Sequence, residues 1–172
     1  MKHYGLESFL EVVTYSEEEH FKGVDLALKI GADNLIGGMP WYTEKTLTYI
    51  EEKGEPLKFY PYIGKIVGHP CVLEGSIDVI IKDGQRSEAL GIDGINLLLY
   101  RYKGDQTALL KATLEKLKTP LIVAGNVTAP DQINELKQNN IWAFTIGGAI
   151  FEKKFVKDGN FPDQIKTVLN YL

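Results

Sequence analysis

The sequence predicts an α/β protein of about six repeated strand–helix units, arranged as a reduced or incomplete barrel in a single domain over residues 1–172. Short apolar runs alternate with longer stretches whose apolar residues recur at helical spacing, a pattern typical of a parallel sheet covered by helices. In addition, one junction occurs twice, at residues 30–36 (IGADNLI) and 90–96 (LGIDGIN). Each copy reads as helix end, glycine, apolar residue, aspartate and strand, which indicates repeated units.

The first half of the chain contains three such units. Ser16 and Glu19 form a capping-box pattern that predicts a helix start, and Gly31 predicts its left-handed end. The next helix is expected over residues 43–53, before Gly54. The expected strands cover residues 9–14, 34–36 and 57–63. A loop over residues 64–75 follows, twice the usual length and therefore a candidate functional segment.

The second half repeats the pattern. A helix is expected over residues 76–90, where Gly84 marks either a close-packing point or a break. Asp105 is expected to cap the following helix, and a last helix starts near Pro162. Strands are expected over residues 94–100, 121–124 and 141–146, with a helix at 130–138 between the last two.

Composition narrows the classes of function. Hydrophobic residues make up 44% and charged residues 24%, and the formal net charge is −4 without a basic run, which argues against nucleic-acid and anionic-membrane binding. The single cysteine, Cys71, excludes a disulfide framework within the chain and fits the cytoplasm. The N-terminal stretch lacks the apolar core of a signal peptide, and no apolar run approaches the ~20 residues of a membrane helix. We therefore expect a cytoplasmic protein with no membrane partner.

Two glycine turns end the last two expected strands. Gly125-Asn126 follows the first of these strands, and Gly147-Gly148 follows the second. Glycine reaches positive φ and lets a ligand approach main-chain N–H groups. A short helix opening at Gly148 would add the unpaired N–H groups that attract anions. Two such turns on adjacent parallel strands predict a phosphate site.

Residues 124–126 (AGN) followed by a helix, and residues 145–151 (TIGGAIF), resemble the C-terminal quarter of the ribulose-phosphate-binding βα-barrels, a TIM-barrel superfamily. This superfamily includes hexulose-phosphate synthases, pentulose-phosphate epimerases and hexosamine-phosphate epimerases. The resemblance covers residues 90–155 well and the earlier part only in architecture. It implies a TIM-barrel-like fold and a phosphorylated small-molecule ligand, but the fold hosts many chemistries. The Asp-x-Lys pair usual on an early strand of these barrels is absent here.

Alternation along the strands assigns one set of polar residues to the barrel interior. That set consists of Glu11, Asn34, Lys58, Tyr60, Asn96 and Thr145, with Tyr62, Leu98 and Tyr100 on the same side. Interior polar groups are costly unless they are paired or used. One interpretation is a satisfied network centred on a Glu11–Lys58 ion pair. The other is catalytic, with Lys58 as a Schiff-base or general-base lysine and Glu11 as a general base.

The loops after the strands supply further candidates. Lys65 and His69 lie in the long loop, and Arg101 and Lys103 follow the fourth strand. Together on one rim they could hold a phosphate or carboxylate. No His/Asp/Glu cluster has metal-ligand spacing, and nucleotide fingerprints are absent, so we expect neither metal nor cofactor.

The sequence therefore favours an enzyme that acts on a small phosphorylated carbonyl compound, as a lyase, aldolase, epimerase or isomerase. The alternative is a non-catalytic sensor that resembles glycerol-phosphate-responsive antiterminators. Because an eight-unit barrel takes ~250 residues, six units leave parallel strand edges uncovered. We therefore expect a homo-oligomer that covers them.

Overall fold

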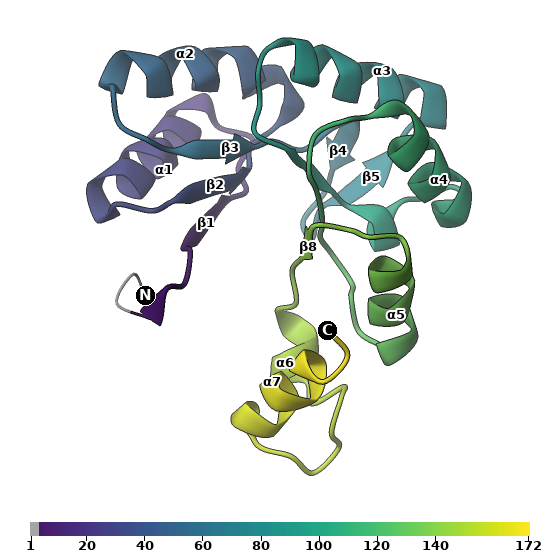
Figure 1. The fold of residues 1–172 in the computed structure, drawn as a ribbon. Coiled ribbons are helices and arrows are strands. Elements are labelled where there is room, and N and C mark those ends of the chain that lie inside the picture. Colours follow the sequence, from purple (N-terminus) through teal and green to yellow (C-terminus); the bar gives the residue numbers. More distant parts are fainter. Residues whose placement is uncertain (1–3) are drawn as a thin grey trace.

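A computed structural model describes residues 4–172, so His3 lies outside the described part of the chain. Helices form an arc on the outside, and the strands line its inner side (Figure 1). The first three strand–helix units place β1, β2 and β3 beside one another, with α1 and α2 outside them. Their bounds are β1 Phe9–Val12, α1 Glu17–Ile30, β2 Asn34–Gly37, η2 Pro40–Tyr42, α2 Thr43–Lys53 and β3 Lys58–Tyr60.

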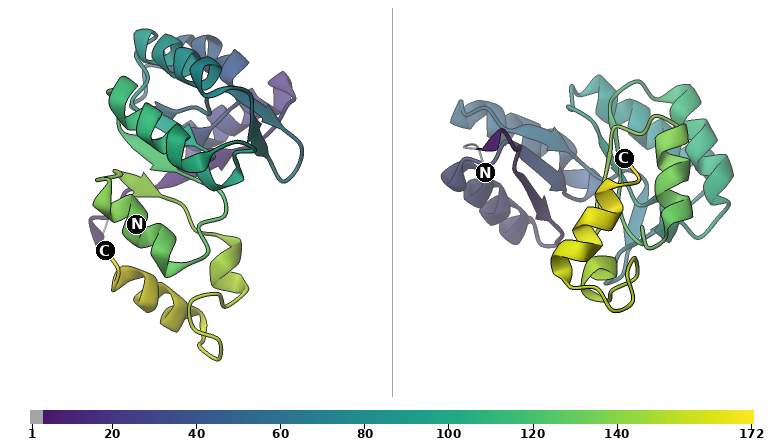
Figure 2. Two further views of the ribbon diagram at one scale, coloured as in Figure 1. Left: turned by 90° about the vertical axis from the view of Figure 1, so that its right-hand side faces the viewer. Right: turned by 60° about the horizontal axis from the view of Figure 1, so that its bottom comes forward.

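The second half of the arc follows a short antiparallel hairpin. Helices α3, α4 and α5 continue the outer layer, and the short helix α6 and the final helix α7 extend from the end of the last strand (Figures 1 and 2). The bounds are β4 Lys65–Val67, β5 Val72–Glu74, α3 Ile77–Ala89, β6 Ile95–Leu97, η3 Leu99–Arg101, α4 Gln106–Lys116, β7 Leu121–Val123, α5 Pro130–Gln138, β8 Ala143–Phe144, α6 Gly148–Phe151 and α7 Phe161–Leu169.

Within residues 4–172, six parallel strands form the inner wall in the order of the sequence. The order β1-β2-β3 makes one sheet and β6-β7-β8 another. A parallel bridge between Tyr62 and Asn96 joins the two sheets, and the amide of Asn96 donates to the carbonyl of Pro61 at 2.9 Å. The expected six strand–helix units are thus confirmed. The paired strands are shorter than expected: β3 covers three residues and β8 covers two.

Side chains alternate between the two faces of this wall as the sequence predicts. Leu35, Phe59 and Leu97 are fully buried in clusters formed with the outer helices. Ile36, Tyr60 and Ile122 form a separate small cluster on the inner face, in register across the strands. Alternation therefore holds for β2, β3, β6 and β7, and it fixes which residues face the interior.

Helix ends follow the capping residues. Ser16 accepts a hydrogen bond from the amide of Glu19, and Asp105 accepts one from the amide of Ala108 at 2.9 Å. Gly31 ends α1 at a φ of 65°, a left-handed conformation that glycine adopts without strain. These three ends agree with the sequence prediction.

The structure corrects two expectations and settles a third. Residues 64–75 form the hairpin β4–β5 rather than an irregular loop. Tyr100 does not face the interior, because the chain turns into η3 and its hydroxyl donates to Glu135 of α5 at 2.7 Å. Gly84 lies within an unbroken α3, and a Cβ there would approach Cδ1 of Leu117 to 2.7 Å, so it is a close-packing point.

The arc of strands does not close into a barrel within residues 4–172. β1 and β8 pair on one side only and stand at the two ends of the strand order. Aromatic rings span the interior between these ends. Trp142 stacks on Tyr60 with ring centroids 5.4 Å apart, and Phe9 lies 6.3 Å from Trp142. Because Phe9 and Trp142 remain 42% and 47% exposed, the interior is open on this side.

Within the described residues no helix is long and apolar enough to span a membrane.

Candidate functional site

A cavity of about 440 Å³ lies where the parallel strands end. Its wall combines both glycine turns with residues from β1, from the segment after β3 and from the hairpin turn. Ligand sites of parallel α/β barrels lie at this carboxyl end of the strands. The lining residues that carry polar or reactive groups are Glu11, Tyr62, His69, Cys71, Arg101, Asn126, Thr128, Thr145 and Glu152, together with Gly125, Gly147 and Gly148. We call this space the mouth cavity.

The first glycine turn is held in a left-handed conformation at both residues. Gly125 has a φ of 80° and Asn126 a φ of 60°. Asparagine tolerates this region better than most residues. Arg101 packs over the turn, because a Cβ on Gly125 would lie 2.9 Å from Cδ of Arg101. The arginine Nε also donates to Oδ1 of Asn126 at 3.2 Å. The turn therefore places a guanidinium beside an exposed backbone.

The second glycine turn is open to solvent. A Cβ on Gly147 would meet nothing within 4 Å, and one on Gly148 would meet only Oε1 of Glu152 at 3.6 Å. Glu152 is an anion at the same place, and it pairs with Lys154 at 3.3 Å. In the backbone hydrogen bonds described outside helices and strands, the amides of Gly125, Asn126 and Gly147 donate to no carbonyl.

Glu11 and Tyr62 meet at the mouth cavity. The Tyr62 hydroxyl donates to Oε1 of Glu11 at 2.8 Å, and Tyr62 is only 2% exposed. Burial raises the pKa of the Tyr62 phenol well above its ordinary value near 10, and the Glu11 carboxylate raises it further. The positive charge of Arg101 acts in the opposite direction. Tyr62 therefore remains protonated at neutral pH.

The hairpin contributes the third wall. His69 and Cys71, in the turn between β4 and β5, line the mouth cavity. Cys71 is buried, and its carbonyl accepts a hydrogen bond from Nη1 of Arg101 at 3.4 Å. Lys65 lies on β4, outside the lining, and its Nζ is 3.0 Å from Oε2 of Glu74. The structure thus brings His69 to the site and leaves Lys65 in a solvent-exposed ion pair.

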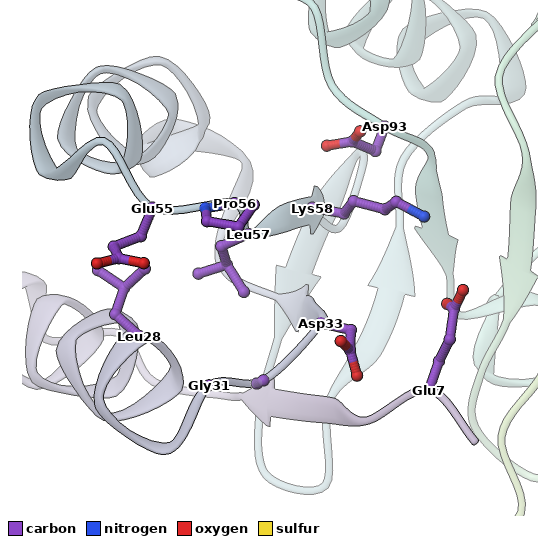
Figure 3. Close-up of a pocket in the computed structure, with 10 residues that line it drawn as sticks. Glu7, Leu28, Gly31, Asp33, Glu55, Pro56, Leu57, Lys58 and Asp93 are labelled. Atoms are coloured by element: carbon purple, nitrogen blue, oxygen red, sulfur yellow. The ribbon is translucent and has the colours of Figure 1, made fainter. Parts of the chain in front are cut away.

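Lys58 lies in a different pocket, at the amino end of the strands. This pocket of about 580 Å³ is lined by Glu7, Asp33, Lys58 and Asp93, among others. Figure 3 shows Lys58 extending between Asp93 on one side and Asp33 and Glu7 on the other. The pocket is larger than the mouth cavity, but the loops that precede barrel strands serve stability rather than catalysis.

The expected network centred on a Glu11–Lys58 ion pair is therefore wrong. Both residues belong to the inner face, but β1 and β3 present them to pockets at opposite ends of the strands. Glu11 pairs with Tyr62 instead. Asn96 is fully buried on the inner face, and neither its Oδ1 nor its Nδ2 has a hydrogen-bond partner among the described residues. Nδ2 of Asn34 donates to Glu7 at 3.1 Å, away from Glu11.

The sequence-predicted residues divide into two groups. Glu11, His69, Arg101, Thr145 and the residues of both glycine turns share the mouth cavity, and Lys58 and Lys65 lie outside it. Sequence reasoning did not select Tyr62, Cys71 or Glu152 as site residues. Alternation had already placed Tyr62 on the inner face, so that signal was present. Cys71 lies within the long segment 64–75 that the sequence marked as a candidate functional segment, whereas no sequence pattern indicated Glu152.

Comparisons with known proteins give structural matches only. No family model matches the chain, and no curated protein matches it. A 4-hydroxy-tetrahydrodipicolinate synthase from Methylacidiphilum fumariolicum SolV is 13% identical with a TM-score of 0.62, over 97% of this chain and 59% of that one. The N-acetylmannosamine-6-phosphate 2-epimerase from Clostridium perfringens is 19% identical with a TM-score of 0.53, over 87% and 60%. The YdjI aldolase from Escherichia coli K12 is 13% identical with a TM-score of 0.52, over 87% and 59%.

These proteins are TIM-barrel enzymes. The chain has the TIM-barrel fold over part of a barrel. It spans about three fifths of the length of these three structures. At identities below 20% the likeness shows the fold, while the chemistry has to be argued from the mouth cavity.

Proposed function

We propose that the protein is an enzyme that acts on a small phosphorylated carbonyl compound, with the phosphate held by the glycine turns after β7 and β8. The observation that carries the proposal is the mouth cavity, which joins both turns to Arg101, Glu11 and Tyr62. Its volume of about 440 Å³ lies within the range of small-molecule sites. The proposed class is the one that the ribulose-phosphate-binding resemblance implies, a lyase, aldolase, epimerase or isomerase.

Charge and backbone both favour an anion at the turns. Arg101 lies over Gly125 and bonds to Asn126, so its guanidinium stands next to the amides of the first turn. Backbone N–H groups together with an arginine are the usual recognition elements for phosphate. Glu152 opposes the anion, and its pairing with Lys154 reduces that opposition. The balance favours a phosphate oxygen near Gly125 and Asn126.

The reactive end of the ligand then faces Glu11 and Tyr62. A carboxylate and a phenol within hydrogen-bond distance of one another can move protons at a carbonyl compound. His69, on the hairpin turn, forms part of the same wall and is a second candidate for acid–base work. Every named group stands on a loop or strand end at the same rim.

Paired phosphorylated and unphosphorylated compounds test this function. Dihydroxyacetone phosphate and ribulose 5-phosphate are incubated with the protein beside dihydroxyacetone and ribulose, and products are followed by mass spectrometry. We expect conversion of the phosphorylated compounds only, and we expect Arg101→Met to reduce the rate of that conversion. Binding of the phosphorylated compounds without conversion would favour the alternative function, a non-catalytic sensor. Equal conversion of the unphosphorylated compounds would exclude a role for phosphate binding at the glycine turns.

We also propose that a second copy covers the open side between β1 and β8. Unpaired parallel edges and exposed interior aromatic rings are features that proteins cover. Apolar side chains near both ends of the strand order are exposed, namely Leu6 and Phe9 at β1 and Trp142 just before β8.

A further inference from the structure

We propose that Tyr62 and Glu11 act together as the proton-transfer pair of the mouth cavity, so that the reaction is a proton transfer at the carbon next to a carbonyl. The reaction class is then isomerisation between ketose and aldose, without an imine intermediate. This inference rests on the proposed function, because it assumes a phosphorylated carbonyl compound in the cavity.

The geometry gives each group a distinct position. Glu11 comes from β1, and Tyr62 from the segment between β3 and β4, which forms a parallel bridge to Asn96 of β6. The tyrosine ring is buried and fixed by the strand bridge at Asn96, while Glu11 remains exposed to the cavity. The 2.8 Å hydrogen bond joins a rigid donor to an accessible carboxylate. General acid–base catalysis requires groups within hydrogen-bond reach of the proton that moves, and both groups line the same cavity.

Electrostatics keep the donor protonated. Burial and the neighbouring carboxylate both raise the pKa of the Tyr62 phenol, so its hydroxyl carries a proton at neutral pH. In the free protein that proton is directed at Glu11. A substrate carbonyl oxygen that enters the cavity competes for the same hydrogen bond. The exchange frees Glu11 to accept a proton from carbon.

The steps balance without an added reactant. Glu11 removes the proton from the carbon beside the carbonyl, and the C–H electron pair forms a carbon–carbon double bond. The carbonyl π pair moves to oxygen, where the Tyr62 hydroxyl stabilises the resulting enediolate by hydrogen bonding. Return of the proton from Glu11 to the same face of the same carbon regenerates the substrate, with a solvent hydrogen where Glu11 has exchanged its proton. After proton movement between the two oxygens, return to the neighbouring carbon exchanges ketose and aldose.

An imine route lacks its nucleophile. Of the residues that line the mouth cavity within 4–172, none is a lysine. Lys58 belongs to the amino-end pocket, and Lys65 is paired with Glu74. A Schiff base requires an amine in contact with the carbonyl carbon. The position of the lysines therefore favours proton transfer over imine chemistry.

Deuterium wash-in tests the pair. The protein is incubated in D2O with dihydroxyacetone phosphate or ribulose 5-phosphate, and incorporation at carbon is measured by mass spectrometry against a protein-free blank. We expect Glu11→Gln and Tyr62→Phe each to slow incorporation by about 100-fold or more. Inorganic phosphate should bind both variants within about twofold of wild type, which also shows that they are folded.

A second tyrosine–glutamate pair supplies the control. Tyr100 donates to Glu135 at 2.7 Å, between η3 and α5 and outside the mouth cavity. Tyr100→Phe removes a hydroxyl of the same kind and should leave incorporation unchanged. The double variant of Glu11 and Tyr62 should be no slower than the slower single variant, because residues that act as a unit are not additive.

Several results would overturn the inference. If Tyr62→Phe incorporates deuterium at the wild-type rate, the tyrosine is not part of the pair. If Glu11→Gln does so, Glu11 is not the base. If Tyr62→Phe fails to fold, Glu11→Gln still decides the base. A borohydride-trapped adduct on Lys58 or Lys65 would replace proton transfer by imine chemistry. Phosphate binding at the turns without wash-in into either compound refutes the pair but keeps the phosphate site. Absence of phosphate binding instead refutes the proposed function.

Discussion

Arg101 donates from Nε to Oδ1 of Asn126 at 3.2 Å, and this bond ties the end of η3 to the glycine turn after β7. A bound phosphate at the turn would therefore lie next to a guanidinium that is already oriented. Arg101→Met should weaken inorganic phosphate binding by about 10- to 100-fold, the range expected for one hydrogen bond to a charged group. Calorimetric titration measures it, and an unchanged affinity would remove Arg101 from the site.

Substitution of Gly125 distinguishes the cost of backbone strain from the loss of phosphate binding at the first glycine turn. Gly125→Ala places a Cβ at a φ of 80° and 2.9 Å from Arg101, whereas Gly54→Ala has a φ of 65° and open space around it. Both changes should cost about 1–2 kcal/mol of unfolding free energy, from left-handed backbone alone. Only Gly125→Ala should also weaken phosphate binding. Equal binding by both variants would show that the first turn does not hold the anion.

Glu152 opposes an anion at the second turn, so its removal should help. Glu152→Gln is expected to strengthen phosphate binding by a few-fold at low salt and by less at high salt, because the carboxylate is exposed and screened. Glu115→Gln, on the outer helix α4, serves as the matched control. An affinity that falls in Glu152→Gln would mean that the carboxylate binds a cationic group of the ligand.

Acid should destabilise the protein through His20. This side chain is fully buried against Tyr42, and its Nε2 lies 2.8 Å from Oγ1 of Thr46. Burial lowers its pKa, although Glu17 acts in the opposite direction. The unfolded chain then binds more protons, so stability is full above about pH 6.5 and falls as pH drops below it. His20→Gln should reduce the pH dependence of the unfolding free energy between pH 7 and 5. His69→Gln, at an exposed position, should leave that dependence unchanged. A wild-type slope in His20→Gln would contradict this.

Much of the fold followed from periodicity, because helices and paired strands place apolar residues at fixed intervals. Ser16, Gly31 and Asp105 marked helix ends correctly, since capping is a local interaction. The hydrogen bond between Glu11 and Tyr62 could not be predicted from periodicity. Alternation assigns a face but not a height along the strand, and height decides whether Glu11 meets Lys58 or Tyr62. The hairpin at residues 64–75 was missed because its strands pair over only three residues each.

The open side of the arc predicts association. Light scattering at micromolar concentration should give a dimer or larger. Trp142→Glu should shift it towards monomer, because Trp142 lies at the interior opening between β1 and β8. Trp41 serves as the control, because it is similarly exposed, at 52% against 47% for Trp142, but belongs to η2 and contacts Tyr15. Trp41→Glu should therefore leave the oligomeric state unchanged. A wild-type monomer would contradict the second-copy proposal.

The most direct test of the account is an NMR titration of the protein with inorganic phosphate. If the glycine turns hold the anion, the amide resonances of Gly125, Asn126, Gly147 and Gly148 shift first and saturate with one affinity. Arg101→Met should weaken that affinity while leaving the resonances of the amino-end pocket unmoved. Shifts confined to the residues around Lys58, with the four turn amides unchanged, would contradict the account.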